Sequence, residues 1–297
     1  MRFDPVQLET LVAIAEEGTF DAAARRLHVT PSAVSQRVRA LENAAGTVLV
    51  RRTAPAGVTP AGEPLLRLGR QLRLLAAEAA VEVADEGGAP GSDVVDLRVA
   101  VNADSLLTWF PPVLGAVAGR PATALRLFIE DQAYSHDLLR RGDVLAAVTD
   151  SPDPVQGCSA EPLGVLRYVA VAAPDLLERH RHGRRLDRGS LPMVVFNERD
   201  HLQDRALAPL GLDRPRVVHR VPSAADFLTA LVAGLGWGMC PVLALRSGPG
   251  AALERLRGVP AIDVPLHWQR WRIASPALDD LSDAVRSAAR SLRPPAS

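Results

Sequence analysis

The feature that most constrains the fold is a change of hydrophobic periodicity at EGGAPGSD, residues 86–93. Before this segment, apolar residues recur every three or four positions, which is the spacing of amphipathic helices. After it, strand-forming runs alternate with helical segments, which is typical of α/β domains. The segment itself is rich in glycine and predicts a linker. We therefore expect a helical part, residues 1–86, a hinge at 87–93, and an α/β part at 94–297.

The first 60 residues predict three short helices followed by a strand pair. Thr30-Pro31 is an N-cap followed by proline at the first helical position, and Gly46 is a stop signal for the same helix. Thr19 and Gly18 mark the boundary between the first two helices in the same way. The expected elements are helices at 5–16, 19–27 and 31–45 and strands within 47–52 and 56–60. This order predicts a winged helix-turn-helix over residues 1–60.

The third predicted helix has an unusually polar front. Its apolar stripe is Ala33, Val34, Val38 and Leu41, whereas its first turns carry residues that strengthen a helix poorly. In a helix-turn-helix, the second helix of the motif lies in the major groove with its N-terminal residues at base edges. Serine permits close approach, glutamine pairs with adenine, and arginine reaches guanine or phosphate. The residues expected to contact DNA from this helix are Thr30, Ser32, Ser35, Gln36, Arg37 and Arg39.

Charge supports this interpretation only when it is counted locally. The chain has 34 basic and 34 acidic residues, so its net charge is zero, and every basic residue is arginine. Residues 24–52, however, contain six arginines and one acidic residue, Glu42, which is a local charge of +5. Such a patch supplies the salt-dependent and sequence-independent part of DNA affinity.

Residues 61–86 predict one long helix. Leu65, Leu68, Leu72, Leu75 and Ala79 step by three and four, as a and d positions do in a coiled coil. The stripe favours dimerisation, and packing against the chain's own body is the alternative.

The α/β part predicts two lobes with a cleft between them. Strands are expected at 94–101, 124–130, 143–149, 166–173, 192–196, 215–221 and 267–275, and helices at 105–118, 135–142, 223–234 and 277–292. This alternation implies mainly parallel sheets with helices on both faces. Lobe I is expected at about 94–164 and 268–297, and lobe II at about 165–267.

Several segments resemble one family of regulators. FDAAARRLHVTPSAVSQRVRALE resembles the signature of LysR-type transcriptional regulators, and EDQAYSHDLLRRGDVLAAVT and GLGWGMCP resemble the ArgP/LysG subgroup. The resemblance implies a winged helix-turn-helix, a linker helix and a two-lobed effector domain similar to periplasmic binding proteins. It implies a homodimer or homotetramer that senses lysine or arginine and activates an amino-acid exporter gene, with RNA polymerase as a further partner. It also implies contacts to phosphate or the minor groove from the wing residues Arg51, Arg52 and Thr59.

Polar residues at the predicted strand ends suit a basic amino acid. Ligands of open α/β sheets bind beyond the carboxyl ends of strands, and helix starts near Ser105 or Ser223 can hold a carboxylate. Acidic residues can neutralise the two cations, and Trp109 can stack on the side chain. The residues expected to bind the effector are Asn102, Asp104, Ser105, Trp109, Glu130, Asp131, Gln132, Thr149, Asn197, Asp200, Ser223 and Asp226.

Other functional classes lack their signatures. The sequence has no Gly-x-Ser-x-Gly elbow and no phosphate loop, and its histidines and two cysteines lack metal-ligand spacing, so neither an enzyme nor a metal or cofactor is expected. Asp4, Glu9 and Glu16 interrupt any signal-peptide core, and no apolar run approaches the roughly 18 residues of a membrane span. We expect a cytoplasmic protein that binds double-stranded DNA. An effector-free architectural or replication-related DNA-binding role remains the alternative, and lysine and arginine remain alternative effectors.

Overall fold

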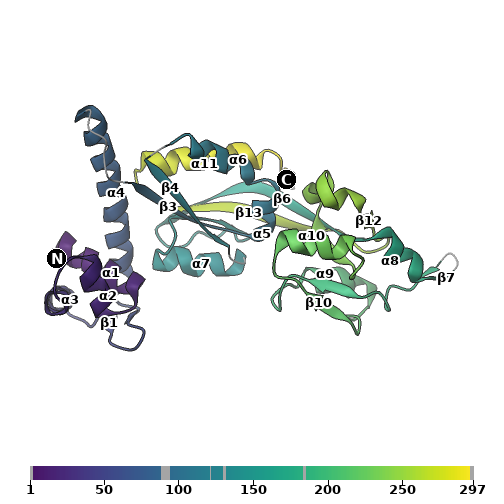
Figure 1. The fold of residues 1–297 in the computed structure, drawn as a ribbon, viewed down its shortest axis with the longest axis horizontal. Coiled ribbons are helices and arrows are strands. Elements are labelled where there is room, and N and C mark those ends of the chain that lie inside the picture. Colours follow the sequence, from purple (N-terminus) through teal and green to yellow (C-terminus); the bar gives the residue numbers. More distant parts are fainter. Residues whose placement is uncertain (1–2, 88–93, 121, 130–131, 183–184, 295–297) are drawn as a thin grey trace.

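Three helices and a strand pair form an N-terminal winged-helix domain in the computed structural model, which describes residues 3–87, 94–120, 122–129, 132–182 and 185–294 (Figure 1). The helices are α1 (Pro5–Glu17), α2 (Phe20–Arg26) and α3 (Pro31–Ala45), and the wing strands are β1 (Val50–Arg51) and β2 (Gly57–Val58). All five lie where the sequence predicted them, although the strands are shorter than the runs that predicted them.

Local capping explains the helix boundaries. The hydroxyl oxygen of Thr19 accepts a hydrogen bond from Ala22 N at 3.1 Å, and that of Thr30 accepts one from Ala33 N at 3.2 Å. Gly18 and Gly46 end α1 and α3 with φ angles of 69° and 70°, a region that glycine enters without steric cost. The apolar faces of the three helices form one buried core, which also takes in Leu65 and Leu66 from the next helix.

The long helix α4 (Glu63–Gly87) belongs to two cores. Its first turns pack on α1, where a Cβ on Gly69 would lie 2.8 Å from Val12 Cγ2. Further along, Leu74 is buried in the core of the α/β domain. Leu72 and Leu75 are each 38% exposed, so part of the predicted stripe is uncovered in the single chain. Val83, four residues beyond the end of that stripe, is 70% exposed.

Two long antiparallel strands, β6 (Cys158–Ala172) and β13 (Ile262–Trp271), form the backbone of the α/β domain. Their sheet has the order β11-β6-β13-β5-β3-β4, with β12 also pairing with β6. The other strands of this sheet are β3 (Val95–Val101), β4 (Thr123–Ile129), β5 (Ala146–Thr149), β11 (Gly238–Pro241) and β12 (Glu254–Arg255). Helices α6 (Pro111–Ala118) and α11 (Pro276–Ala289) cover one face of it, and α7 (Gln132–Arg141) covers the other (Figure 1).

The part of this domain that is built on β3, β4 and β5 is called lobe I. The part that contains the elements of the next sentence is called lobe II. These elements are α8 (Pro174–Arg179), β7 (Arg181–His182), β8 (Arg185–Leu186), β9 (Met193–Val195), α9 (Leu202–Leu207), η1 (Ala208–Leu210), β10 (Val218–Arg220), α10 (Ala224–Val232), η2 (Val242–Leu245) and η3 (Gly248–Ala252). Strands β6 and β13 pair with β11 and β5 respectively, so they run from one lobe into the other. The two lobes are therefore connected by continuous strands.

Three sequence predictions about this domain were wrong. The helix predicted at 105–118 is two helices, α5 (Ala103–Thr108) and α6, because Pro111 and Pro112 lack the N–H groups that would continue α5. The sheet is not mainly parallel: β3 pairs in parallel with β4 and β5, whereas β6 pairs antiparallel with β11, β12 and β13. The strand 166–173 was also predicted too short, because β6 begins at Cys158.

Cys158 and Cys240 are both buried thiols, and burial raises the pKa of Cys158 to about 11. Within the described ranges, no helix is long and apolar enough to cross a membrane. The predicted hinge falls almost entirely on residues 88–93, which lie outside the described residues.

Candidate DNA-binding surface and ligand cavity

The outer face of α3 is polar and exposed, whereas its inner face is buried. Val34, Val38 and Leu41 are at most 1% exposed and attach the helix to the winged-helix core. Ser32, Gln36 and Arg39 are exposed, and Ser35 and Arg37 are half-buried. In Figure 1, α3 lies on the side of this domain that faces away from the α/β domain. Its polar face is therefore open to a large partner.

The wing and the N-cap hold the other residues that were predicted to contact DNA. Arg51 and Arg52 are exposed, and the Arg52 guanidinium lies 5.4 Å from the ring centroid of Phe20. The Thr59 hydroxyl donates to Val48 O at 2.8 Å, so it fixes the start of α4 against the wing. The Thr30 hydroxyl caps α3 and shares a 2.9 Å hydrogen bond with Ser32. Thr30 and Thr59 thus have structural partners of their own.

One arginine of the local positive patch is neutralised. Arg26 Nη1 lies 2.6 Å from Glu16 Oε2 and 3.4 Å from Glu17 Oε1, and both acids precede the window in which the charge was counted. The positive charge available to a polyanion on this surface is therefore smaller than the sequence count.

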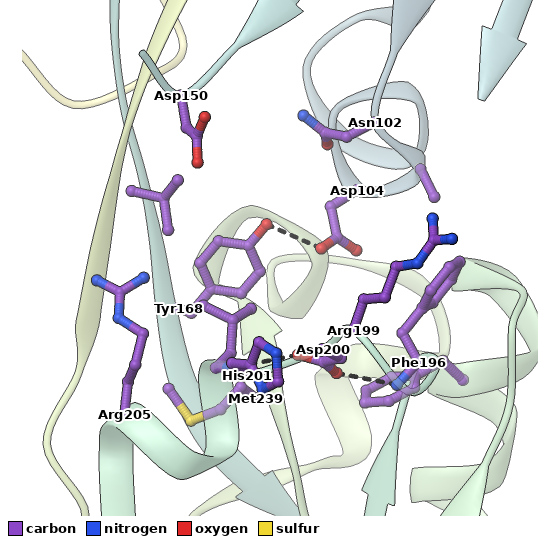
Figure 2. Close-up of a pocket in the computed structure, with 14 residues that line it drawn as sticks. Asn102, Asp104, Asp150, Tyr168, Phe196, Arg199, Asp200, His201, Arg205 and Met239 are labelled. Carbon is purple, nitrogen blue, oxygen red and sulfur yellow. Dashed lines mark hydrogen bonds between the residues drawn. The ribbon is translucent and has the colours of Figure 1, made fainter. Parts of the chain in front are cut away.

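A cavity of about 260 Å³ lies between the two lobes (Figure 2). Lobe I lines it with side chains from the turn after β3 and the end of β5. The other lining side chains come from β6, the segment from β9 to α9, and the inner faces of α10, β11 and β13. Its lining residues are Asn102, Ala103, Asp104, Asp150, Tyr168, Phe196, Arg199, Asp200, His201, Leu202, Arg205, Phe227, Met239 and Val264.

The lobe I wall of the cavity carries carboxylates and one unsatisfied amide. Asp104 follows β3 and Asp150 follows β5, and both reach the upper part of the cavity in Figure 2. Asn102 caps α5, since its Oδ1 accepts from Ser105 N at 2.7 Å. The Nδ2 of Asn102 is buried and has no hydrogen-bond partner among the described residues. A buried amide donor without a partner at a cavity wall is a place for a ligand acceptor.

Tyr168 forms the floor beneath Asp104. Its hydroxyl donates to Asp104 Oδ2 at 2.8 Å, and the residue is only 2% exposed. Burial and the nearby Asp104 carboxylate raise the pKa of Tyr168 well above its usual value of 10. Tyr168 therefore remains protonated and acts as a permanent donor to Asp104.

The lobe II wall carries two arginines and a histidine. Arg199 and His201 come from the segment after β9, and Arg205 comes from α9. Asp200 also lines the cavity, but its carboxylate accepts hydrogen bonds from Phe196 N at 2.9 Å, Gln203 Nε2 at 3.1 Å and Leu202 N at 3.1 Å. Because these internal donors surround Asp200, its main role is to shape the turn into α9.

Only some of the predicted effector residues line the cavity: Asn102, Asp104 and Asp200. Ser105, Trp109 and Thr149 are buried outside it, Asp226 is exposed outside it, and Asn197 and Ser223 are half-buried outside it. Glu130, Asp131 and the side chain of Gln132 lie outside the described part of the structure.

The expectation for Trp109 requires a correction. The helix that was predicted to carry it toward the cleft ends at Thr108, and the indole packs edge-on against Phe110 at 5.7 Å within the hydrophobic core. At 2% exposure, Trp109 has no open face for a ligand.

Four residues that line the cavity were not predicted from the sequence: Tyr168, Arg199, His201 and Arg205. Arg199 and His201 directly flank Asp200, so the strand-end argument pointed to the right segment and chose only its acids and amide. Tyr168 lies in mid-strand, where no strand-end rule applies, because β6 crosses from lobe to lobe. Asp150, which directly follows the predicted strand 143–149, was also not among the predicted residues and lines the cavity.

The arrangement matches a zwitterion with an additional positive charge. Carboxylates from one lobe face cations from the other, so an ammonium and a carboxylate on one small molecule would each find an opposite charge. A ligand that contacts both walls would also hold the two lobes together.

Two family models together match nearly the whole chain. The model described as bacterial regulatory helix-turn-helix protein, lysR family, matches residues 5–63. The model described as LysR substrate binding domain matches residues 93–294.

Curated relatives match over the full length. The lysine export transcriptional regulatory protein LysG of Corynebacterium glutamicum is 43% identical over 301 residues, which cover 98% of this chain and 100% of the relative. The regulator ArgP of Pseudomonas fluorescens is 39% identical over 276 residues, which cover 91% of each chain. These relatives are transcriptional regulators and not enzymes, in agreement with the sequence prediction.

Solved full-length structures share the fold. ArgP from Mycobacterium tuberculosis gives a TM-score of 0.85 at 41% identity and covers 99% of both chains. LysG from Corynebacterium glutamicum with bound effector arginine gives 0.80 at 42% identity, covering 98% of this chain and 100% of the other. Another full-length structure of that LysG gives 0.61 at the same identity, covering 99% and 100%. The predicted fold class is thereby confirmed.

Proposed function

Because the chain belongs to the LysR family of bacterial transcriptional regulators, we propose that it controls an amino-acid exporter gene in response to arginine or lysine. The single observation that carries the ligand assignment is the cavity with carboxylates on its lobe I wall and arginines on its lobe II wall. The arginine-bound LysG structure and the name of the lysine export regulator support the same ligand class.

A basic amino acid has two cations and one carboxylate to accommodate. Asp104 and Asp150 supply negative charge for the α-ammonium and the side-chain cation. Arg199, Arg205 and the unsatisfied Nδ2 of Asn102 supply donors for the α-carboxylate. Neutral and acidic amino acids bring no side-chain cation for the second carboxylate of the cavity, so they would make one charge-assisted contact fewer.

The DNA-binding half of the proposal rests on α3 and the wing. Ser32, Gln36 and Arg39 present donors and acceptors toward a major groove, and Arg51 and Arg52 contact the flanking backbone. The uncovered stripe on α4 would pair two chains, so that two α3 helices reach successive half-sites in the cytoplasm. Ligand binding would then change how the paired modules bend DNA or contact RNA polymerase, provided that the ligand prefers one arrangement.

Calorimetric titration with arginine, lysine, histidine and glutamate tests the ligand assignment. We expect arginine or lysine to bind, and Asp104→Asn to weaken that binding by about 10–150-fold, because a charge-assisted contact contributes about 1.5–3 kcal/mol. Asp226→Asn is the matched control, because Asp226 is exposed outside the cavity. This variant should bind the amino acid as tightly as the wild type does. A chain that binds DNA but none of the four amino acids would refute the effector and favour an effector-free regulator.

A further inference from the structure

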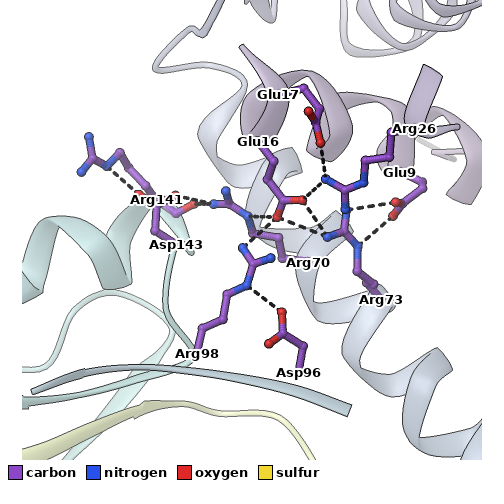
Figure 3. A network of polar contacts seen from close by, with 10 residues as sticks. All are labelled: Glu9, Glu16, Glu17, Arg26, Arg70, Arg73, Asp96, Arg98, Arg141 and Asp143. Carbon is purple, nitrogen blue, oxygen red and sulfur yellow. Dashed lines mark hydrogen bonds and ion pairs between the residues drawn. The ribbon is translucent and has the colours of Figure 1, made fainter. Parts of the chain in front are cut away.

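Glu16 is the centre of an ion-pair network that joins the winged-helix domain, α4 and the α/β domain (Figure 3). Its carboxylate lies 2.6 Å from Arg26 of α2, 2.9 Å from Arg73 of α4 and 2.8 Å from Arg98 of β3. Arg70 of α4 lies 3.9 Å away. One side chain at the end of α1 is thus paired with cations from three other elements.

The environment keeps this carboxylate ionised. The Glu16 side chain is 13% exposed, and burial alone would raise its pKa. The positive charges of Arg73, Arg98 and Arg26 outweigh the burial and lower the pKa of Glu16 to about 2. Replacing one buried partner leaves the remaining charges uncompensated, so the network is sensitive to the position of each arginine.

Separate contacts already hold α4 on the α/β domain. Arg70 Nη1 lies 2.9 Å from Asp143 Oδ1, and Glu78 Oε1 accepts from Ser275 Oγ at 2.7 Å and from Ala277 N at 3.0 Å. A Cβ on Gly142 would lie only 3.3 Å from the Cα of Arg67, so the turn before β5 touches α4 closely. The contact of Glu16 with Arg98 adds something different, because it connects the winged-helix domain directly to a strand of lobe I.

That strand also leads into the ligand cavity. Arg98 lies in the middle of β3, and β3 ends at Val101, immediately before Asn102 and Asp104 in the cavity wall. One rigid, hydrogen-bonded strand therefore carries the ligand contacts at its end and the winged-helix contact in its middle. A movement of β3 along or across the sheet would change both.

We infer that the Glu16–Arg98 ion pair couples the occupancy of the cavity to the orientation of the winged-helix domain. Glu16 and Arg98 are positioning residues: neither lines the cavity or lies on the DNA-facing side of α3. The inference rests on the proposed function, because it assumes that a ligand in the cavity changes DNA binding. Two full-length structures of the Corynebacterium LysG match this chain with TM-scores of 0.80 and 0.61, which is a difference between two structures of one protein.

Two pairs of substitutions separate this contact from general charge effects. Glu16→Gln removes the central charge, and Glu17→Gln is its control, because Glu17 contacts only Arg26, at 3.4 Å, in the described network. Arg98→Gln removes the strand contact, and Arg126→Gln is its control. Arg126 is the register partner of Arg98 on β4, and both arginines pair with Asp96, at 2.9 Å from Arg126 and 3.1 Å from Arg98. Arg126 is 63% exposed, however, and makes no described contact with Glu16.

The measurement is the affinity for a DNA duplex that the wild-type chain selects from a random pool, with and without saturating arginine and lysine. Allosteric effectors change affinity by about 5–150-fold, and we expect this factor to approach 1 in Glu16→Gln and Arg98→Gln. Both variants should still show arginine binding by calorimetry, and both controls should keep the wild-type factor. A purely structural role would lower thermal stability without changing the factor.

A distance measurement keeps the inference testable without any effector. Spin labels on Ala44→Cys in α3 and Gly115→Cys in α6, two exposed positions, report the separation of the two domains in labelled chains diluted with unlabelled chains. We expect a broader distance distribution in Glu16→Gln and Arg98→Gln than in their controls. Unchanged distributions together with an unchanged effector factor would refute the coupling. If the wild-type chain binds none of the amino acids but the distance distribution is still broader in Glu16→Gln, only the proposed effector would be refuted.

Discussion

Tyr168 shows how a single buried hydroxyl can shape the wall of a cavity. It holds the Asp104 carboxylate in place from below, at 2.8 Å, where water cannot do so. Tyr168→Phe keeps the ring and removes the donor, and we expect the free energy of unfolding to fall by about 1.5–3 kcal/mol, the range for hydrogen bonds to charged groups. Urea denaturation measures this change. An unchanged midpoint would mean that Asp104 finds another donor.

Glu16 predicts a specific dependence of stability on pH. Its pKa is about 2 in the folded chain against an ordinary value of 4.5, so its contribution is complete above pH 4.5 and is lost as the pH falls toward 2. The contribution is on the order of 3 kcal/mol. In thermal melts between pH 6 and about 3, Glu16→Gln should lose less stability on acidification than the wild type. Glu17→Gln should follow the wild type, and parallel curves for all three chains would contradict the assignment.

At the scale of the element, α3 has a buried apolar face and an exposed polar face. We expect Gln36→Ala to weaken binding to the selected DNA by about 5–150-fold, corresponding to the 1–3 kcal/mol of a bidentate base contact, with the fold retained. Asn43→Ala, an exposed substitution at the far end of the same helix, is the control. Fluorescence anisotropy measures both. Equal affinities for the two variants would show that the front of α3 does not face the bases.

The wing predicts a different signature, because phosphate contacts release counterions. Arg51→Ala should weaken binding to all sequences alike and reduce the slope of log K against log salt by about 1. Titrations between low and moderate salt measure the slope. A variant that changed sequence preference and kept the wild-type slope would place Arg51 at a base edge and not at the backbone.

At the scale of the whole molecule, the exposed stripe on α4 predicts the assembly. Leu72 and Leu75 are each 38% exposed on a helix whose other face is buried, and hydrophobic residues at this spacing pair helices. Leu72→Glu with Leu75→Glu should dissociate the assembly in analytical ultracentrifugation and reduce DNA affinity with it. Ala61→Glu, an exposed site just before α4, is the control. An oligomer that survived the double substitution would be held by another surface.

The DNA-binding half of the chain was largely determined by local sequence. Caps at Thr19 and Thr30, stops at Gly18 and Gly46, and the stripe Val34, Val38 and Leu41 are signals between near neighbours. Helices depend mainly on such signals, so the predicted helix bounds agree with the structure. Even here, the sequence count missed that Arg26 is neutralised, because its partners Glu16 and Glu17 lie on another helix.

The cavity and the domain contacts were decided by tertiary structure. The sequence alone indicated Asn102, Asp104 and Asp200, which line the cavity, because residues after strands share one edge of a sheet. The sequence did not indicate Tyr168 or Arg205, because their positions depend on strands β6 and β13 crossing between the lobes. It misplaced Trp109, because the break between α5 and α6 turns that residue into the core. Glu16 and Arg98 are 82 residues apart, and only folding brings them within 2.8 Å. Pairing between distant charges leaves no periodic trace in the sequence, whereas helix caps and apolar stripes do.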